Sequence, residues 1–243
     1  MNLWHAEAAK KMTDFIKAYF PESETDIVGS LLAPGTLDIC SDVDMKISLS
    51  GNTPVNMKEL TEALSGHFCP IFGCEVHHNP CSDVLRVCFA NGWRFDLSFL
   101  YPQAQAAPEA AVSFLDRAES TVHGFWFLAS MVLVKLGRND FLIAAHLALE
   151  LCQLHIVLQM LMRDAEKGTG IHRFGDGEDV PVLRSLMSRG GCCDVPQNSK
   201  DAILDILFRV AEQMDASSAA VLPGYVARSE TLDALCRQMR IRR

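Results

Sequence analysis

Residues 41–49 read Ser-Asp-Val-Asp-Met-Lys-Ile-Ser-Leu, with an apolar side chain at every second position from Val43 onward. This is the period of a β-strand with one buried face. The same alternation places Asp42 and Asp44 together on the other face, roughly 6.5 Å apart along the strand. Two carboxylates in such proximity repel each other, by about 4 kcal/mol at 4 Å under an effective dielectric near 20. The pattern favours a cation between them, and a hard divalent ion that keeps positions for phosphate oxygens suits this pair.

A third acid lies on a predicted hairpin. Residues 83–90 and 93–100 are alternating runs joined by Asn91-Gly92, the strongest short-range signal for a β-hairpin. In the second run Asp96 belongs to the polar face. If this strand lies beside residues 41–49, three carboxylates converge, which is the ligand set of a two-metal phosphoryl-transfer site.

Nearby basic residues leave a different explanation open. Lys46 shares the predicted face of Asp42 and Asp44 and could neutralise them in place of a metal. Arg94 could likewise pair with Asp96 across a diagonal of the sheet. Strands disfavour Asp, however, so two on one face beside a third favour the metal interpretation.

These residues resemble a known signature. Gly29-Ser30, a turn at Gly35, the Asp42-Val43-Asp44 pair and the later Asp96 are similar, in order and spacing, to the nucleotidyltransferase superfamily that includes DNA polymerase beta. The resemblance implies that Gly29 and Ser30 bind the phosphates of a nucleoside triphosphate through the serine hydroxyl and backbone amides. ATP is the first candidate for this nucleotide. It also implies Mg²⁺ as cofactor, with Asp42 and Asp44 bridging two ions and Asp96 holding the ion that activates the acceptor hydroxyl.

The chain after residue 120 resembles the helical partner domain of the antibiotic nucleotidyltransferases, in their aminoglycoside and lincosamide branches. The similar segments are Gly-Phe-Trp-Phe at 124–127, Lys-Leu-Gly-Arg-Asn-Asp at 135–140, and the helix that follows. The resemblance implies that Lys135 and Arg138 supply positive charge to the triphosphate. The alternative is that both residues cap the C-terminus of a helix.

Composition limits the class of protein. The chain has 243 residues, 49% of them hydrophobic, and a formal net charge of −8, so we expect a globular protein. The acidic balance argues against a long nucleic-acid substrate, which would require a basic groove. It is compatible with a polycationic small molecule, or it simply aids solubility. Nine cysteines without a C-x-x-C pair indicate a reduced, cytoplasmic protein.

The element pattern predicts an α+β fold, with a small mixed β-sheet nucleotidyltransferase domain followed by an all-α helical bundle. We place the first domain at residues 1–104, a linker at 101–107 and the helical acceptor-binding domain at 108–243. Polar side chains in the long apolar stretch 141–162, and an amphipathic N-terminal run, argue against a membrane span and a signal peptide. The predicted strands are 26–28, 46–49 (the end of the Asp42 strand), 75–78, 83–90 and 93–100; the predicted helices are 3–20, 53–68, 109–119, 121–137, 139–167, 181–188, 199–214 and 229–240, with a loop at 171–180.

Two features of the predicted helices stay open. Phe125, Trp126 and Phe127 are consecutive, so one helix face cannot bury all three, and we expect at least one to point into a ligand cleft or a domain contact. His146 and Glu150 are one turn apart, which suits a metal site or a solvated polar stripe. The spacing from Arg138 to His146 is too long for the RNase motif of related helical domains.

The sequence therefore predicts Mg²⁺-dependent transfer of a nucleotidyl group, with adenylyl as the first candidate, from a nucleoside triphosphate to a hydroxyl of a small-molecule antibiotic. The first candidate for the acceptor is an aminoglycoside and the second is a lincosamide, and the modification would confer resistance. The candidates for a general base are Asp96, Asp140, Glu150 and Asp164. One alternative is a non-catalytic, antitoxin-like or regulatory protein of the same fold that acts through a protein partner. Transfer to RNA fits the acidic charge least.

Overall fold

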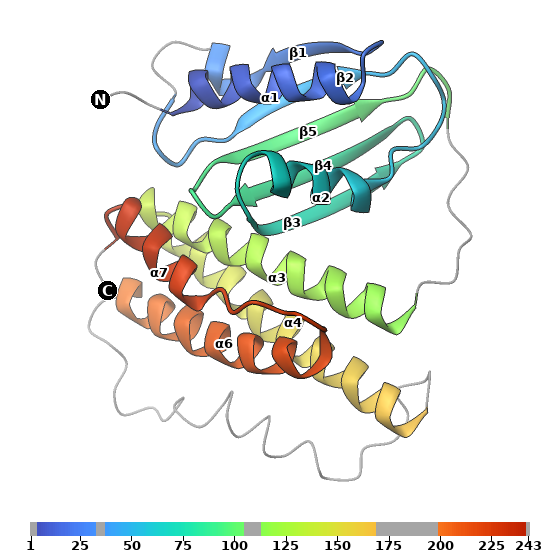
Figure 1. Cartoon of the computed structure of the whole chain (residues 1–243). Helices are drawn as coiled ribbons and strands as arrows, with labels where there is room; N and C mark the ends of the chain where they lie inside the picture. The colour runs from blue at the N-terminus through green and yellow to red at the C-terminus, as the bar shows by residue number, and fades with distance from the viewer. Residues whose placement is uncertain (1–3, 33–36, 105–112, 169–198, 242–243) are drawn as a thin grey trace, which may run out of the picture. The chain divides into compact units, whose positions relative to one another are not determined.

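The structure is a computed structural model that describes residues 4–32, 37–104, 113–168 and 199–241. It divides into two compact units, Met1–Ala111 and Val112–Arg243. Among these residues, Figure 1 shows a sheet with helices in the first unit and helices alone in the second, which confirms the predicted α+β class. The predicted turn at Gly35, the loop 171–180 and the helix 181–188 lie outside the described residues.

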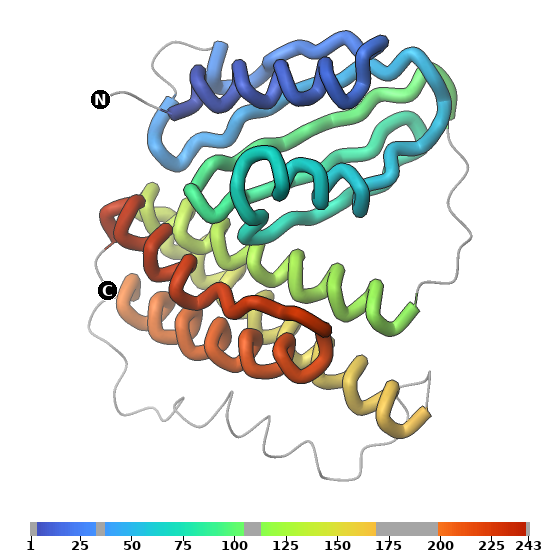
Figure 2. Tube along the Cα trace, viewed as in Figure 1, coloured from blue at the N-terminus to red at the C-terminus, as the bar shows by residue number. Residues whose placement is uncertain are grey.

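The first unit is built on a five-stranded mixed sheet with strand order β1-β2-β5-β4-β3. Strands β2 and β5 are parallel, and the other neighbouring strands are antiparallel. Two helices cover one face of this sheet, as the trace in Figure 2 shows. The elements are α1 (His5–Tyr19), β1 (Glu24–Val28), the 3₁₀ turn η1 (Gly29–Leu32), β2 (Val43–Ser48), α2 (Met57–His67), β3 (Ile71–Asn79), β4 (Ser82–Phe89) and β5 (Arg94–Leu100).

The core of the first unit lies between the helices and the covered face of the sheet. Val43, Met45 and Ile47 of β2 are buried there, and so are Phe95 and Leu97 of β5. Because side chains alternate along a strand, the acids at positions 42, 44 and 96 are excluded from this core and lie on the opposite face.

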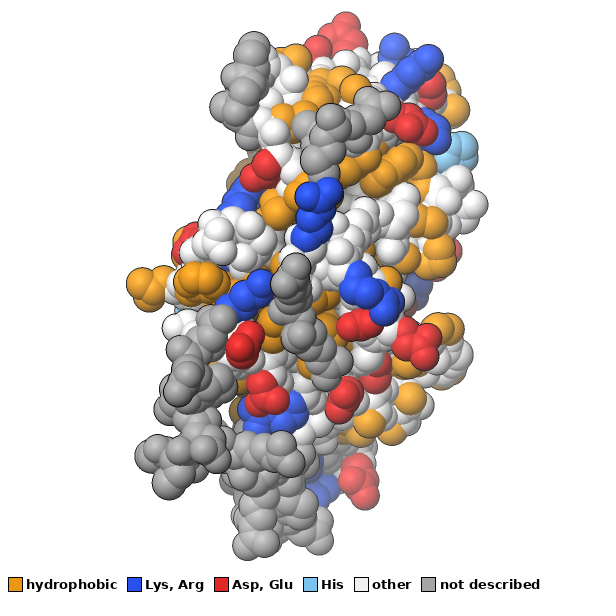
Figure 3. Space-filling view, turned by 90° about the vertical axis from the view of Figure 1, so that its left-hand side faces the viewer, with side chains coloured by type: hydrophobic (Ala, Val, Ile, Leu, Met, Phe, Trp, Pro, Cys, Tyr) orange, Lys and Arg blue, Asp and Glu red, His pale blue; other side chains and the backbone are white. Residues whose placement is uncertain are grey.

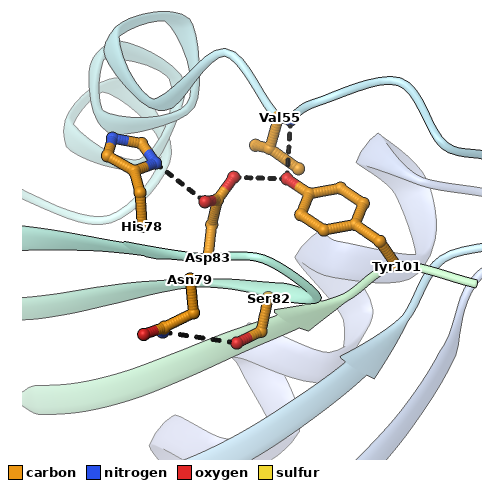
Figure 4. A network of polar contacts seen from close by, with 6 residues as sticks. All are labelled: Val55, His78, Asn79, Ser82, Asp83 and Tyr101. Atoms are coloured by element: carbon orange, nitrogen blue, oxygen red, sulfur yellow. Dashed lines mark hydrogen bonds and ion pairs between the residues drawn. The ribbon is translucent and has the colours of Figure 1, made fainter. Parts of the chain in front are cut away.

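The hairpin predicted at Asn91-Gly92 is confirmed. Strands β4 and β5 pair antiparallel around it, and Gly92 has a φ of 85°, which a tight turn requires. At the far end of the same strands, buried Asp83 accepts a hydrogen bond from the Tyr101 hydroxyl and contacts His78 Nδ1 at 2.7 Å (Figure 4). The Tyr101 oxygen also accepts from the backbone N–H of Val55 at 3.0 Å. This network fixes the segment that enters α2.

The predicted start of α2 at Thr53-Pro54 is wrong. Asn56 caps the helix, because its side-chain oxygen accepts from the N–H of Glu59 at 3.3 Å. The backbone N–H of Val55 is already held by Tyr101, so the chain stays extended until the cap.

The second unit contains α3 (Phe114–Gly137), α4 (Phe141–Lys167), α6 (Ser199–Val221) and α7 (Ser229–Gln238). The predicted break between residues 119 and 121 is absent, since α3 runs unbroken from its N-cap Ser113. Thr121 sits inside the helix by donating its hydroxyl to the carbonyl of Arg117 at 2.8 Å. Helix α4 is capped by Asp140, which accepts from the N–H of Ile143, and ends at Gly168 in the left-handed conformation.

Helix α3 is buried on more than one side. It packs against α4, α6 and α7. Phe125, Trp126 and Phe127 are all buried, which agrees with the expectation that more than one face of the helix is covered and not with a side chain exposed in a ligand cleft. The indole N–H of Trp126 donates to the hydroxyl of Tyr225 at 2.9 Å. By length and composition alone α3 and α4 are each apolar enough to cross a membrane, but they also pair with each other inside this bundle.

Candidate active site

Gly29 and Asp44 lie against each other at the junction of β1 and η1. Val28 is the register partner of Asp44 in the antiparallel pair β1–β2, so the next residue lies directly beside the Asp44 side chain. A Cβ placed on Gly29 would collide with Asp44 Oδ2 and lie 3.0 Å from its Cγ. Gly29 also has a φ of 74°, which favours glycine. The Gly-Ser turn and the Asp-x-Asp strand therefore form one local structure.

Asp44 and Asp96 are direct partners across the parallel strands β2 and β5. Asp42 precedes β2, and all three carboxylates are partly exposed on the open face of the sheet. The acid-bearing strands are therefore neighbours, as the sequence predicted. The structure gathers Gly29, Ser30 and the three acids in the first unit.

The pKa values of Asp44 and Asp96 are raised. Burial first, and then the charges of Asp42 and Asp96, raise the pKa of Asp44 to about 6, against the opposing charge of Arg86. The pKa of Asp96 is also raised, first by burial, while Arg86 acts against the shift. Further positive charge beside these two carboxylates would favour their ionised forms, and a hard divalent cation is suited to supply it.

Arg86, not Arg94, is the partner of Asp96. Arg86 lies on β4 directly opposite Asp96, and its Nε donates to Asp96 Oδ2 at 3.0 Å. The predicted two-residue turn at Asn91-Gly92 would place Val87 opposite Asp96, so the turn signal alone did not identify this pair. The alternative that Arg94 pairs with Asp96 across a diagonal is wrong.

Arg94 instead fixes the loop that carries Asp42. It is buried, and its Nη2 donates to the carbonyls of Ile39 at 3.2 Å and Ser41 at 3.0 Å. His5 Nε2 of α1 lies 3.1 Å from the same Ser41 carbonyl. The residue before Asp42 is thereby tied to both β5 and α1, which sets the position of its carboxylate.

The other cation expected near the acids, Lys46, is exposed and forms no ion pair with any residue that the structure describes. Among the described residues, no group of three or more His, Cys, Asp or Glu side chains is arranged as a metal site. The carboxylate of Asp96 is paired with Arg86 at 3.0 Å. Asp42 and Asp44 remain candidate oxygen ligands on the β2 side.

The candidate residues of the second unit have ordinary structural roles. Lys135 lies in the last turn of α3 and Arg138 is the C-cap residue, where positive charge stabilises a helix end. His146 and Glu150 form an exposed ion pair at 3.3 Å along α4. Asp164 is buried and contacts Arg163 at 3.4 Å.

A cavity of about 590 Å³ in the first unit is separate from the carboxylates. It opens beside Leu49 and Ser50, at the end of β2 away from Asp44, and is lined by Tyr19, Phe20 and the segment that enters α2. None of the three carboxylates lines this cavity.

Comparison with known proteins gives a likeness in structure alone. No family model matches the chain, and no curated protein matches it. Among solved structures the chain is similar to an aminoglycoside 6-adenyltransferase from Bacillus subtilis, with 13% sequence identity and a TM-score of 0.40. The match covers 83% of this chain and 89% of that one. A likeness at this level carries no argument about activity.

Proposed function

We propose that the protein is a Mg²⁺-dependent nucleotidyltransferase. It transfers a nucleotidyl group, with adenylyl as the first candidate, from a nucleoside triphosphate to a hydroxyl of a small molecule. The observation that carries the proposal is the contact of Gly29 with Asp44, beside the direct pairing of Asp44 with Asp96. It puts a backbone turn suited to phosphate next to three carboxylates, of which Asp96 is paired with Arg86. We infer a cytoplasmic enzyme, because its nucleotide co-substrate and its reduced cysteines belong there.

The candidate residues of the first unit each have a role in this reaction. The amides and hydroxyl of Gly29-Ser30 bind and orient the triphosphate, and Asp42, Asp44 and Asp96 would hold Mg²⁺, which would supply positive charge to the phosphate oxygens. Arg94 and His5 keep the Asp42 carboxylate in place through the Ser41 carbonyl.

The transfer is an in-line displacement at the α-phosphorus. The acceptor hydroxyl oxygen bonds to phosphorus, the bond to the oxygen bridging the α- and β-phosphorus atoms breaks, and pyrophosphate leaves. The hydroxyl proton passes to a base, for which Asp96, Asp140, Glu150 and Asp164 are the candidates. Burial raises the pKa of Asp96, and a raised pKa makes a carboxylate a better proton acceptor.

We infer a polycationic acceptor, first an aminoglycoside and then a lincosamide, whose modification confers resistance. The net charge of −8 attracts such a molecule, and α4 supplies acidic residues for its amino groups. On the face drawn in Figure 3, acidic and basic side chains are interspersed over the described surface. Lys135 and Arg138 are proposed as the cations of the second unit that meet the triphosphate.

A non-catalytic role through a protein partner is the second candidate. The observation that favours it is the ion pair of Arg86 with Asp96, since an acid already neutralised by arginine does not need a metal. In that case nucleotide and metal would leave the melting temperature unchanged.

Mass spectrometry tests the proposal directly. The protein is incubated with ATP, Mg²⁺ and a panel of aminoglycosides and lincosamides, and a gain of one nucleotidyl group identifies the acceptor. The Asp44→Asn variant, which keeps the size of the side chain, is the control and should give no product. Lack of product from every acceptor, with folded protein, contradicts the proposal.

A further inference from the structure

Four charged side chains form one row across the sheet. Asp44 of β2 is paired with Asp96 of β5, Asp96 with Arg86 of β4, and Arg86 with Glu75 of β3. Each is the direct register partner of the next, so their side chains project from the same face. The row reads acid, acid, base, acid, and Asp42 adds another acid at its β2 end.

Arg86 is the cation of this row and is shared by two acids. Its Nε donates to Asp96 Oδ2 at 3.0 Å, and its Nη1 lies 3.9 Å from Glu75 Oε2. The three side chains are between 25% and 31% exposed, so solvent and ions reach them. Without Arg86, the half-buried Asp96 carboxylate would face Asp42 and Asp44 with no positive neighbour among the residues paired with it.

We propose that Arg86 is a positioning residue that acts as a built-in counter-ion and lowers the metal affinity of the carboxylate site by competing for Asp96. The inference rests on the proposed function, because it concerns the metal that Asp42, Asp44 and Asp96 would hold. An arginine and a divalent ion that bind the same carboxylate repel each other, so each weakens the binding of the other. Glu75 works in the opposite direction, since it draws the guanidinium away from Asp96.

The test measures binding of Mn²⁺ alone to the full-length protein, by electron paramagnetic resonance of the free ion. Arg86→Gln, which removes the charge, should bind Mn²⁺ at least tenfold more tightly than wild type. Arg86→Lys, which keeps the charge, should bind within about threefold of wild type. Glu75→Gln should bind several-fold more weakly, because Arg86 is then committed to Asp96.

Two further variants separate competition for Asp96 from a general change in charge. Lys46→Gln removes an exposed cation on β2, two residues from Asp44, and should change the affinity less than threefold. In an Asp96→Asn background, Arg86→Gln should have no effect, since the acid for which it competes is gone. An equal gain in the Lys46 variant, or an undiminished gain in the Asp96→Asn background, overturns the proposal.

The outcomes also separate this inference from the proposed function. Mn²⁺ binding that is lost in Asp44→Asn but unchanged in Arg86→Gln overturns the inference and leaves the metal site standing. Absence of binding in both wild type and Arg86→Gln overturns both. If Arg86→Gln does not fold by circular dichroism, Glu75→Gln reports the same competition, and an affinity equal to wild type then overturns the inference.

Discussion

The space that a side chain at Gly29 would need is filled by the carboxylate of Asp44. The contact joins the turn after β1 to the neighbouring strand β2, and it accounts for glycine at this position by space as well as by backbone conformation. It is the most direct physical link between the predicted phosphate turn and the predicted metal ligands.

Gly29→Ala should lower both stability and turnover, because the new Cβ displaces Asp44 and the φ of 74° strains any side chain. We expect a loss of about 2–4 kcal/mol in the free energy of unfolding, measured by urea denaturation. Gly168→Ala is the matched control, since Gly168 has a φ of 65° but nothing within 4 Å of its Cβ. Equal losses in the two variants would show that the Asp44 contact contributes nothing.

Asp44→Asn should stabilise the metal-free protein at pH 8 but not at pH 3.5. The folded pKa of Asp44 is raised from 3.8 to about 6, so its contribution to stability is fully present below the unfolded value and is lost as pH rises to about 6. Asparagine removes this loss. Thermal melts across pH 3.5–8 measure it, and a melting temperature of the variant at or below wild type at pH 8 contradicts the prediction. With Mg²⁺ and ATP added, wild type should gain stability and the variant little.

His123 should make the second unit sensitive to acid. Burial, and then the charge of Arg228, lower its pKa from 6.5 to about 4, and its Nδ1 lies 3.5 Å from Arg228 Nη1. Between these pH values the imidazole is therefore protonated in the unfolded state and neutral in the folded state. The free energy of unfolding falls as pH drops from about 6.5 to about 4, by at most about 3 kcal/mol. His123→Gln should flatten this fall, which chemical denaturation at several pH values measures. An unchanged slope would place the acid sensitivity elsewhere.

The two units should divide the proposed reaction between them. Residues 1–104 contain Gly29, Ser30 and the three acids on a sheet with its own core, so we expect this fragment to bind Mg²⁺-nucleotide weakly. It should not transfer, because holding two substrates together contributes up to roughly 7–11 kcal/mol of the barrier. Nucleotide titration followed by fluorescence, beside the mass-spectrometric assay, checks both statements. Transfer by the fragment at the full-length rate would remove the second unit from the mechanism.

Acidic residues of α4 and its cap should determine acceptor affinity. Glu150→Gln should raise the acceptor KM, since Glu150 is exposed beside His146, and a residue acting as general base should chiefly lower kcat. Asp140→Asn keeps the helix cap, because asparagine caps as well as aspartate, so its effect reports charge alone. Asp164→Asn and Glu166→Gln complete the series. If none of the four changes alters the acceptor KM or kcat, the assignment of an aminoglycoside as the acceptor is the first to be contradicted.

The sequence by itself determined the elements that carry the site. Alternation along residues 41–49 and the Asn91-Gly92 turn are local signals, because side-chain period and turn conformation depend only on neighbouring residues. They were enough to put Asp42, Asp44 and Asp96 on polar strand faces and to separate a sheet from a set of helices. That Gly29 and Ser30 bind nucleotide and the three acids bind metal remains a prediction.

Only the tertiary structure decided which side chains meet. The pairing of β1 with β2 brings Gly29 against Asp44, and the order β2-β5-β4 gives Asp96 its partner Arg86 while Arg94 turns to the loop before Asp42. The aromatic residues 125–127 are likewise all buried, although they are consecutive on one helix. These contacts join segments far apart in the chain, and no local pattern states which strands and helices become neighbours.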